Sequence, residues 1–154
     1  MNAMITQHFT IKPPAKRKKL RAVLEATQYA EVNFLTREFV VKGRITLDEA
    51  PTEEYVLTVL CFDEQIAVDD VLEIAAKQGL VRPTEYDVFL FGEQYPKPML
   101  DAPLVFLHAP TLIWGGFFFY LNLKPKPNGW EIVPVSTGGE WRSKYYFAFR
   151  QKKK

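Results

Sequence analysis

The sequence predicts an α+β fold, in which N-terminal helices and strands are followed by a mainly antiparallel sheet. Two segments between residues 68 and 94 carry helix signals: an amphipathic apolar period in the first and a capping box in the second. After residue 100 come four apolar, aromatic-rich segments separated by Pro and Gly. Strands do not alternate regularly with helices there, which argues against a doubly wound α/β sheet.

Three elements are expected in the first third of the chain. Residues 15–27 place their apolar side chains at helical spacing behind two prolines, which predicts a short amphipathic helix. Residues 39–47 alternate between apolar and mostly polar side chains, which is typical of a strand. Residues 56–62 are mostly β-branched, aliphatic and aromatic without clean alternation, so we expect a strand covered on both faces, with Cys61 packed inside.

The next two elements are predicted to be helices. From Val68 onward the apolar residues fall at i, i+3, i+4, i+7 and i+8, and Gly79 is placed to end the helix. A second helix should run from residue 85 to about residue 94. Thr84 and Asp87 form its capping box, and Pro96 lies beyond its end.

The second half of the chain is expected to form a strand meander. The predicted strands cover residues 104–107, 117–123, 130–135 and 145–150. Residues 124–128, followed by Gly129, have the Pro, Asn and Gly composition of a hairpin connection.

Length and composition indicate one globular domain. The 154 residues are 47% apolar, enough for one core. We expect a flexible arm at residues 1–14, a single α+β domain at 15–151 and a basic tail at 152–154. Cys61 is the only cysteine, so an intrachain disulfide and a multi-thiolate zinc site are excluded, and a reduced, cytoplasmic location is expected. No apolar run is long enough to predict a membrane span.

No motif predicts a catalytic, metal or cofactor site. His8 and His108 lie at no ligand spacing, and we expect His108 to be a hydrogen-bonded residue at a strand end. The glycine pairs lack the pattern of a phosphate-binding loop. Adjacent carboxylates are explained by loops and helix starts, although a hydrolase or transferase with converging carboxylates is a further hypothesis. We therefore expect no cofactor and a non-enzymatic role.

The aromatic content of the second half suggests a binding surface. Consecutive strand residues face opposite sides, so a block such as residues 117–120 cannot bury every ring against one core. The first hypothesis is a binding or assembly module that presents aromatic strands to a protein partner or to a second copy; the alternative is that helices or loops cover both faces. The candidate partner-binding residues are Trp114, Phe117, Phe119, Tyr120, Trp130, Trp141 and Tyr146.

The two ends of the chain are basic. Half of the 20 Lys and Arg residues lie at positions 12–21 and 150–154, whereas all 18 acidic residues lie between Glu25 and Glu140. These ends suggest a nucleic-acid-associated protein as the alternative function, unless they are only solvated charges. The candidate anion-binding residues are Lys16, Arg17, Lys18, Lys19, Arg21, Lys152, Lys153 and Lys154.

Two segments resemble a known superfamily. The Arg82-Pro83-Thr84-Glu85 sequence after Gly79, and the closing YYFAFRQ segment with Trp141 before it, resemble C-type-lectin-like domains of the formylglycine-generating-enzyme type. A related pattern occurs in uncharacterised bacterial proteins of similar length. The resemblance covers residues 63–96 and 130–151, and it implies a lectin-like scaffold whose loops bind a ligand. Catalytic members hold copper through cysteines, and with Cys61 alone that activity is not carried over.

Overall fold

The computed structural model describes residues 3–13, 31–32, 53–62, 64–113, 117–136, 140–141 and 145–152. The helix expected at residues 15–27 and the strand expected at 39–47 lie outside these residues.

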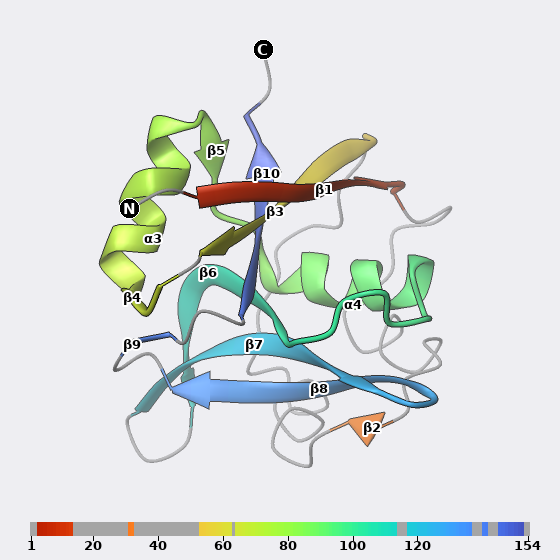
Figure 1. Ribbon diagram of the computed structural model, residues 1–154. Helices are drawn as coiled ribbons and strands as arrows, with labels where there is room; N and C mark the ends of the chain where they lie inside the picture. Colours follow the sequence, from red (N-terminus) through yellow and green to blue (C-terminus); the bar gives the residue numbers. More distant parts are fainter. Residues whose placement is uncertain are drawn as a thin grey trace.

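One mixed, mainly antiparallel sheet dominates the described part of the chain (Figure 1). Its strand order is β1 (Ala3–Ile11), β3 (Tyr55–Phe62), β10 (Tyr146–Gln151), β6 (Leu104–Ile113), β7 (Phe117–Lys126), β8 (Gly129–Ser136) and β2 (Glu31–Val32), and β5 (Leu80–Val81) pairs with β10. The pairs β6–β10 and β2–β8 are parallel. A separate small sheet joins β4 (Ile66–Ala67) to β9 (Glu140–Trp141). The predicted α+β class is confirmed.

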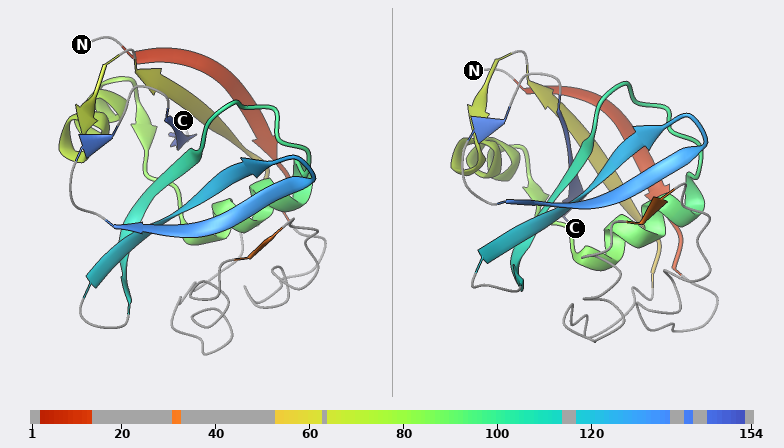
Figure 2. Two further views of the ribbon diagram at one scale, coloured as in Figure 1. Left: turned by 60° about the horizontal axis from the view of Figure 1, so that its bottom comes forward. Right: turned by 90° about the horizontal axis from the view of Figure 1, so that it is seen from below.

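Two described helices follow the predicted bounds closely. The first, α3 (Val68–Lys77), ends before Gly79, whose φ of +76° lies in the left-handed region that favours glycine. The second, α4 (Glu85–Gln94), begins with the predicted capping box of Thr84 and Asp87. Neither helix is long and apolar enough to span a membrane. Figure 2 shows the sheet curving around α4, with α3 lying near β4 and β5.

The central strands are buried on both faces, because their alternate residues enter different hydrophobic clusters. In β3, Leu57 and Val59 join the cluster around α4, whereas Leu60 and Phe62 join the cluster around α3. The predicted double coverage of this strand is confirmed. Cys61, however, is only half-buried, so the expectation that it packs inside was wrong.

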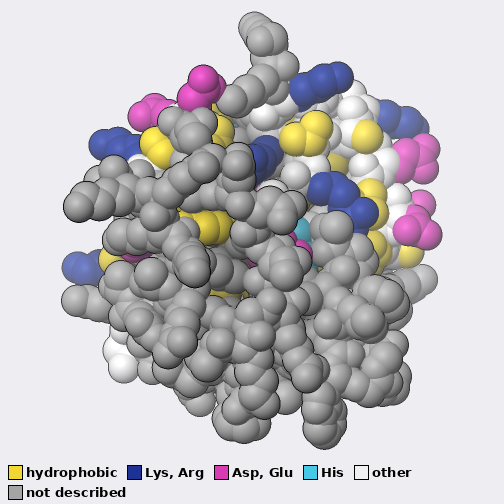
Figure 3. All heavy atoms as spheres, turned by 180° about the vertical axis from the view of Figure 1, so that it is seen from behind, with side chains coloured by type: hydrophobic (Ala, Val, Ile, Leu, Met, Phe, Trp, Pro, Cys, Tyr) yellow, Lys and Arg dark blue, Asp and Glu magenta, His cyan; other side chains and the backbone are white. Residues whose placement is uncertain are grey.

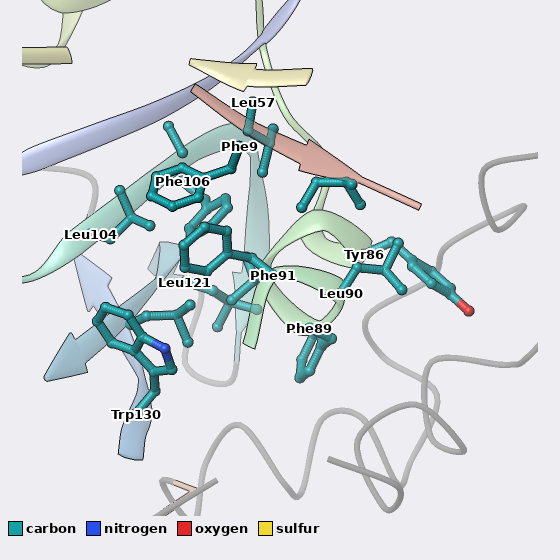
Figure 4. Close-up of a cluster of buried hydrophobic side chains, with 14 of the residues drawn as sticks. Phe9, Leu57, Tyr86, Phe89, Leu90, Phe91, Leu104, Phe106, Leu121 and Trp130 are labelled. Atoms are coloured by element: carbon teal, nitrogen blue, oxygen red, sulfur yellow. The ribbon is translucent and has the colours of Figure 1, made fainter. Parts of the chain in front are cut away.

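Helix α4 is the centre of the larger cluster. All residues from Tyr86 to Gly92 are buried, which is the pattern of a core helix rather than of an amphipathic surface helix. The ring of Phe91 has edge-on contacts with Phe9, Phe106 and Trp130, at centroid distances of 5.0–6.1 Å (Figure 4).

The N-terminal segment differs from the prediction. Residues 1–14 were expected to be a flexible arm, but residues 3–11 form β1, which pairs antiparallel with β3. Phe9 and Ile11 lie in the core cluster around α4, so apolar burial fixes this strand in the sheet. The strands β6, β7 and β8 also extend beyond the predicted bounds, because ladder pairing continues into residues of weak strand propensity.

Candidate functional site

A polar cluster lies where α4 begins. We call it the α4 polar cluster, and it contains Tyr55, Arg82, Thr84, Glu85, Asp87, His108 and Arg150. These residues come from β3, the segment before α4, α4 itself, β6 and β10.

Asp87 is the centre of this cluster, with no exposed surface. One carboxylate oxygen, Oδ2, accepts from the Thr84 backbone N–H at 2.8 Å, which completes the capping box. The guanidinium of Arg150 donates from Nε to Oδ2 and from Nη2 to Oδ1, each at 2.7 Å. Oδ1 also accepts from the Tyr55 hydroxyl. The buried carboxylate is therefore paired with a cation and fully hydrogen-bonded.

The partners of Asp87 are held by one another as well. The guanidinium carbon of Arg150 lies 4.3 Å from the centre of the Tyr55 ring, a cation–π contact. Burial raises the pKa of the Tyr55 hydroxyl well above its usual value, and the neighbouring Asp87 carboxylate raises it further. Burial alone would lower the pKa of Arg150, but the hydrogen bonds and charge of Asp87 outweigh it, so that pKa is raised. The phenol stays neutral and the guanidinium charged.

Arg82 and His108 form hydrogen bonds with backbone groups where the pairing of β6 with β7 is irregular. The β6–β7 register shifts between Phe106 and Thr111, so the residues between them leave the regular ladder. Arg82 donates to the carbonyls of Leu107 and His108 at 2.9 and 3.1 Å. Nε2 of the His108 ring accepts from the Leu121 N–H at 3.0 Å, and it thereby replaces the backbone carbonyl that a paired strand would supply.

The same contacts set the tautomer of His108. Because Nε2 accepts a hydrogen bond from the Leu121 N–H, the neutral ring carries its own proton on Nδ1. That nitrogen lies 3.5 Å from Oε1 of Glu85. The prediction of a hydrogen-bonded histidine is confirmed, although His108 lies inside β6 rather than at a strand end, and it is fully buried.

The α4 polar cluster has the chemistry of a structural joint. Its carboxylate, guanidinium, phenol and imidazole groups bind one another or the backbone, and the contacts given above leave no oriented nucleophile beside a base. Within the described residues, no three His, Cys, Asp or Glu side chains come together in a way that could hold a metal ion. The cluster fixes the start of α4 to β3, β6 and β10.

The structure assigns the predicted partner-binding residues to different environments. Trp130 has no exposed surface, its Nε1 donates to the Tyr95 carbonyl at 2.8 Å, and Tyr120 is 3% exposed. Both rings are therefore core residues and offer no surface to a partner, contrary to the prediction. The side chains of Trp114, Phe117, Phe119 and Trp141 lie outside the described part of the structure.

Tyr146 is half-buried beside a surface groove. Its hydroxyl donates to Asp101 at 2.7 Å, and this hydrogen bond, with partial burial, raises the pKa of Tyr146 to about 12. Asp101 lines a groove of about 710 Å³ between residues 96–101 and the β7–β8 hairpin, together with several prolines and Lys97. The groove brings together no set of groups with evident chemistry.

Most of the basic residues proposed to bind anions also lie outside the described residues. Of that set only Lys152 is described, and its backbone N–H donates to the Gly79 carbonyl at 3.3 Å. Where side chains are coloured in Figure 3, basic and acidic groups lie interspersed rather than in a field of one sign.

The outer edge of β1 was missed by the sequence reasoning. At its C-terminal end, α4 side chains take the place of a neighbouring strand: the Gln94 amide accepts from the Lys12 N–H at 2.9 Å and donates to the Lys12 carbonyl at 2.7 Å. The Tyr95 hydroxyl donates to the Thr10 carbonyl at 2.8 Å. This end of the edge is closed.

No strand or side chain among the described residues covers the N-terminal half of the same edge. Met4 and Ile5 are 53% and 51% exposed, and they are among the most exposed large apolar residues of the described chain. In the described part of the sheet, β1 pairs with β3 alone. The charge-free composition of residues 3–11 was the available signal, because natural edge strands usually carry Lys or Pro.

Comparisons with known proteins add no family to this geometry: no family model, no curated protein and no solved structure matches the chain.

Proposed function

We propose that this chain is a non-enzymatic binding or assembly module whose recognition element is the open half of the β1 edge. We name this element the open edge; it consists of residues 3–8. The proposal rests on the contrast between the two ends of the β1 edge. Gln94 and Tyr95 hydrogen-bond backbone groups at the C-terminal end, whereas Met4 and Ile5 at the N-terminal end are exposed.

Strand addition is the binding mode that this edge supports. An extended segment placed beside β1 would pair with the outward N–H and C=O groups, for which the described residues supply no partner, and would cover Met4 and Ile5. Main-chain hydrogen bonds would supply affinity, and the exposed side chains would supply selectivity. An added strand cannot extend past the closed end, because the Gln94 and Tyr95 side chains already hydrogen-bond the backbone of Lys12 and Thr10.

The contacts of the α4 polar cluster are accounted for by a structural role. Its buried groups are used in holding α4, and Arg82, Thr84 and Glu85 of the lectin-like sequence each serve that joint. A C-type-lectin-like fold stays a prediction that rests on those sequence segments. The aromatic surface likewise stays a prediction for the side chains that lie outside the described part of the structure, namely those of Trp114, Phe117, Phe119 and Trp141.

Site-specific photo-crosslinking in cells tests the proposal. A benzophenone amino acid in place of Ile5 is expected to crosslink to an extended segment, identified by mass spectrometry, either in another protein or in a second copy. The control carries the same group in place of Met99, which is 42% exposed in the loop after α4. Equal and unspecific labelling from the two positions would refute the open edge as the recognition element.

A further inference from the structure

We infer that the occupant of the open edge is a second copy of this chain, paired antiparallel through its own β1 about a two-fold axis at Met4. This inference rests on the function proposed above. It specifies one partner and one register, and each can be tested separately from strand addition in general.

The register follows from which backbone groups face outward. Alternate residues of an antiparallel strand direct both N–H and C=O to the same side. Thr10, His8, Ile5 and Ala3 lie opposite Val56, Thr58, Leu60 and Phe62 of β3. The Thr10 carbonyl points outward, because it accepts from the Tyr95 hydroxyl. Since the four partners are alternate residues of β3, the backbone groups of His8, Ile5 and Ala3 point outward as well.

A β-bulge limits the paired length. The β1–β3 register shifts between Ile5 and Gln7, which bends the strand at Thr6. The regular outward groups before the bulge belong to Ala3 and Ile5. With the axis at Met4, Ala3 of each copy faces Ile5 of the other, and these two pairs share about four backbone hydrogen bonds.

Charge and exposure favour a second copy as the occupant. Residues 3–11 carry no Lys, Arg, Asp or Glu, so antiparallel self-pairing sets no like charges opposite one another. The axis also brings Met4 against Met4, and each copy thereby covers the exposed apolar side chains of the other. Because the pair is short, we expect a weak association, with a Kd on the order of 100 µM.

Sedimentation velocity of the purified full-length chain tests this pairing, with a reductant present so that Cys61 forms no intermolecular disulfide. The wild-type sedimentation coefficient is expected to rise with concentration towards that of a dimer. Met4→Lys and Met4→Glu are each expected to stay monomeric, because like charges then meet at the axis. An equimolar mixture of the two variants is expected to form a dimer, since opposite charges face each other.

The control is Met99→Lys, which adds the same charge at another exposed methionine and is expected to associate like wild type. Circular dichroism checks that all variants are folded. A wild-type chain that stays monomeric at about ten times the expected Kd would overturn the inference. So would a Met4→Lys variant that associates normally, or a mixture that remains monomeric.

The two proposals fail in different ways. If the wild type is monomeric but Ile5 crosslinks a strand of another protein, strand addition stands and self-pairing is wrong. If position 5 captures nothing beyond the Met99 control, the recognition element itself is wrong.

Discussion

Replacing Arg150 with alanine is expected to lower the free energy of unfolding by about 3–5 kcal/mol, the typical cost of leaving a buried charge without its partner. Asp87 has no exposed surface and would lose both guanidinium hydrogen bonds. The cation–π contact with Tyr55 would be lost as well. Urea unfolding followed by tryptophan fluorescence measures the change.

Matched variants separate the parts of this joint. Tyr55→Phe removes one hydrogen bond to Asp87 and keeps the ring, so a loss of about 1 kcal/mol is expected. Arg150→Lys keeps the charge but not the bidentate geometry, and its stability should fall between wild type and Arg150→Ala. Lys77→Ala, which breaks an exposed i,i+4 pair with Glu73, should change stability by less than about 0.5 kcal/mol. An Arg150→Ala loss as small as the Lys77→Ala loss would contradict the role given to the α4 polar cluster.

Replacing Trp130 with alanine is expected to cost about 3–5 kcal/mol of stability, because it opens a large cavity in the core. Its indole has no exposed surface, lies 6.0 Å from the Phe91 ring, and donates to the Tyr95 carbonyl. Thermal unfolding monitored by circular dichroism, combined with urea titration, gives the loss.

Trp130→Phe is the control for this position. It keeps most of the bulk but leaves the Tyr95 carbonyl without its donor, so a smaller loss than that of Trp130→Ala is expected. Neither variant should alter the charge or shape of the open edge. If Trp130→Ala were fully stable but lost self-association, Trp130 would be a partner-binding residue after all.

Local signals in the sequence predicted both described helices and the longer strands from β3 onward, but not β1. The capping box of Thr84 and Asp87 placed the start of α4, and the position of Gly79 placed the end of α3. The rule that consecutive strand residues face opposite sides also holds in β10, where Ala148 and Phe147 belong to different hydrophobic clusters. These features depend only on neighbours in the chain, and for that reason they could be predicted.

Features that depend on distant residues could not be predicted. The bidentate pair of Arg150 with Asp87 joins residues 63 positions apart, and Gln94 hydrogen-bonds Lys12, which lies 82 positions earlier in the chain. The inference that surplus rings must face a partner did not hold for Trp130 and Tyr120, because burial on both faces of the sheet accommodates them. Sheet order decides this, and strand patterns alone do not determine sheet order.

Residue-resolved amide hydrogen exchange across a concentration series tests the open edge most directly. In dilute protein the Lys12 amide, bonded to Gln94, should exchange slowly, whereas the Ile5 and His8 amides should exchange fast. As the concentration rises, exchange at Ile5 should slow while Lys12 stays unchanged. Ile5 and His8 amides as protected as Lys12 in the dilute protein would show that the edge is already covered and would contradict this account.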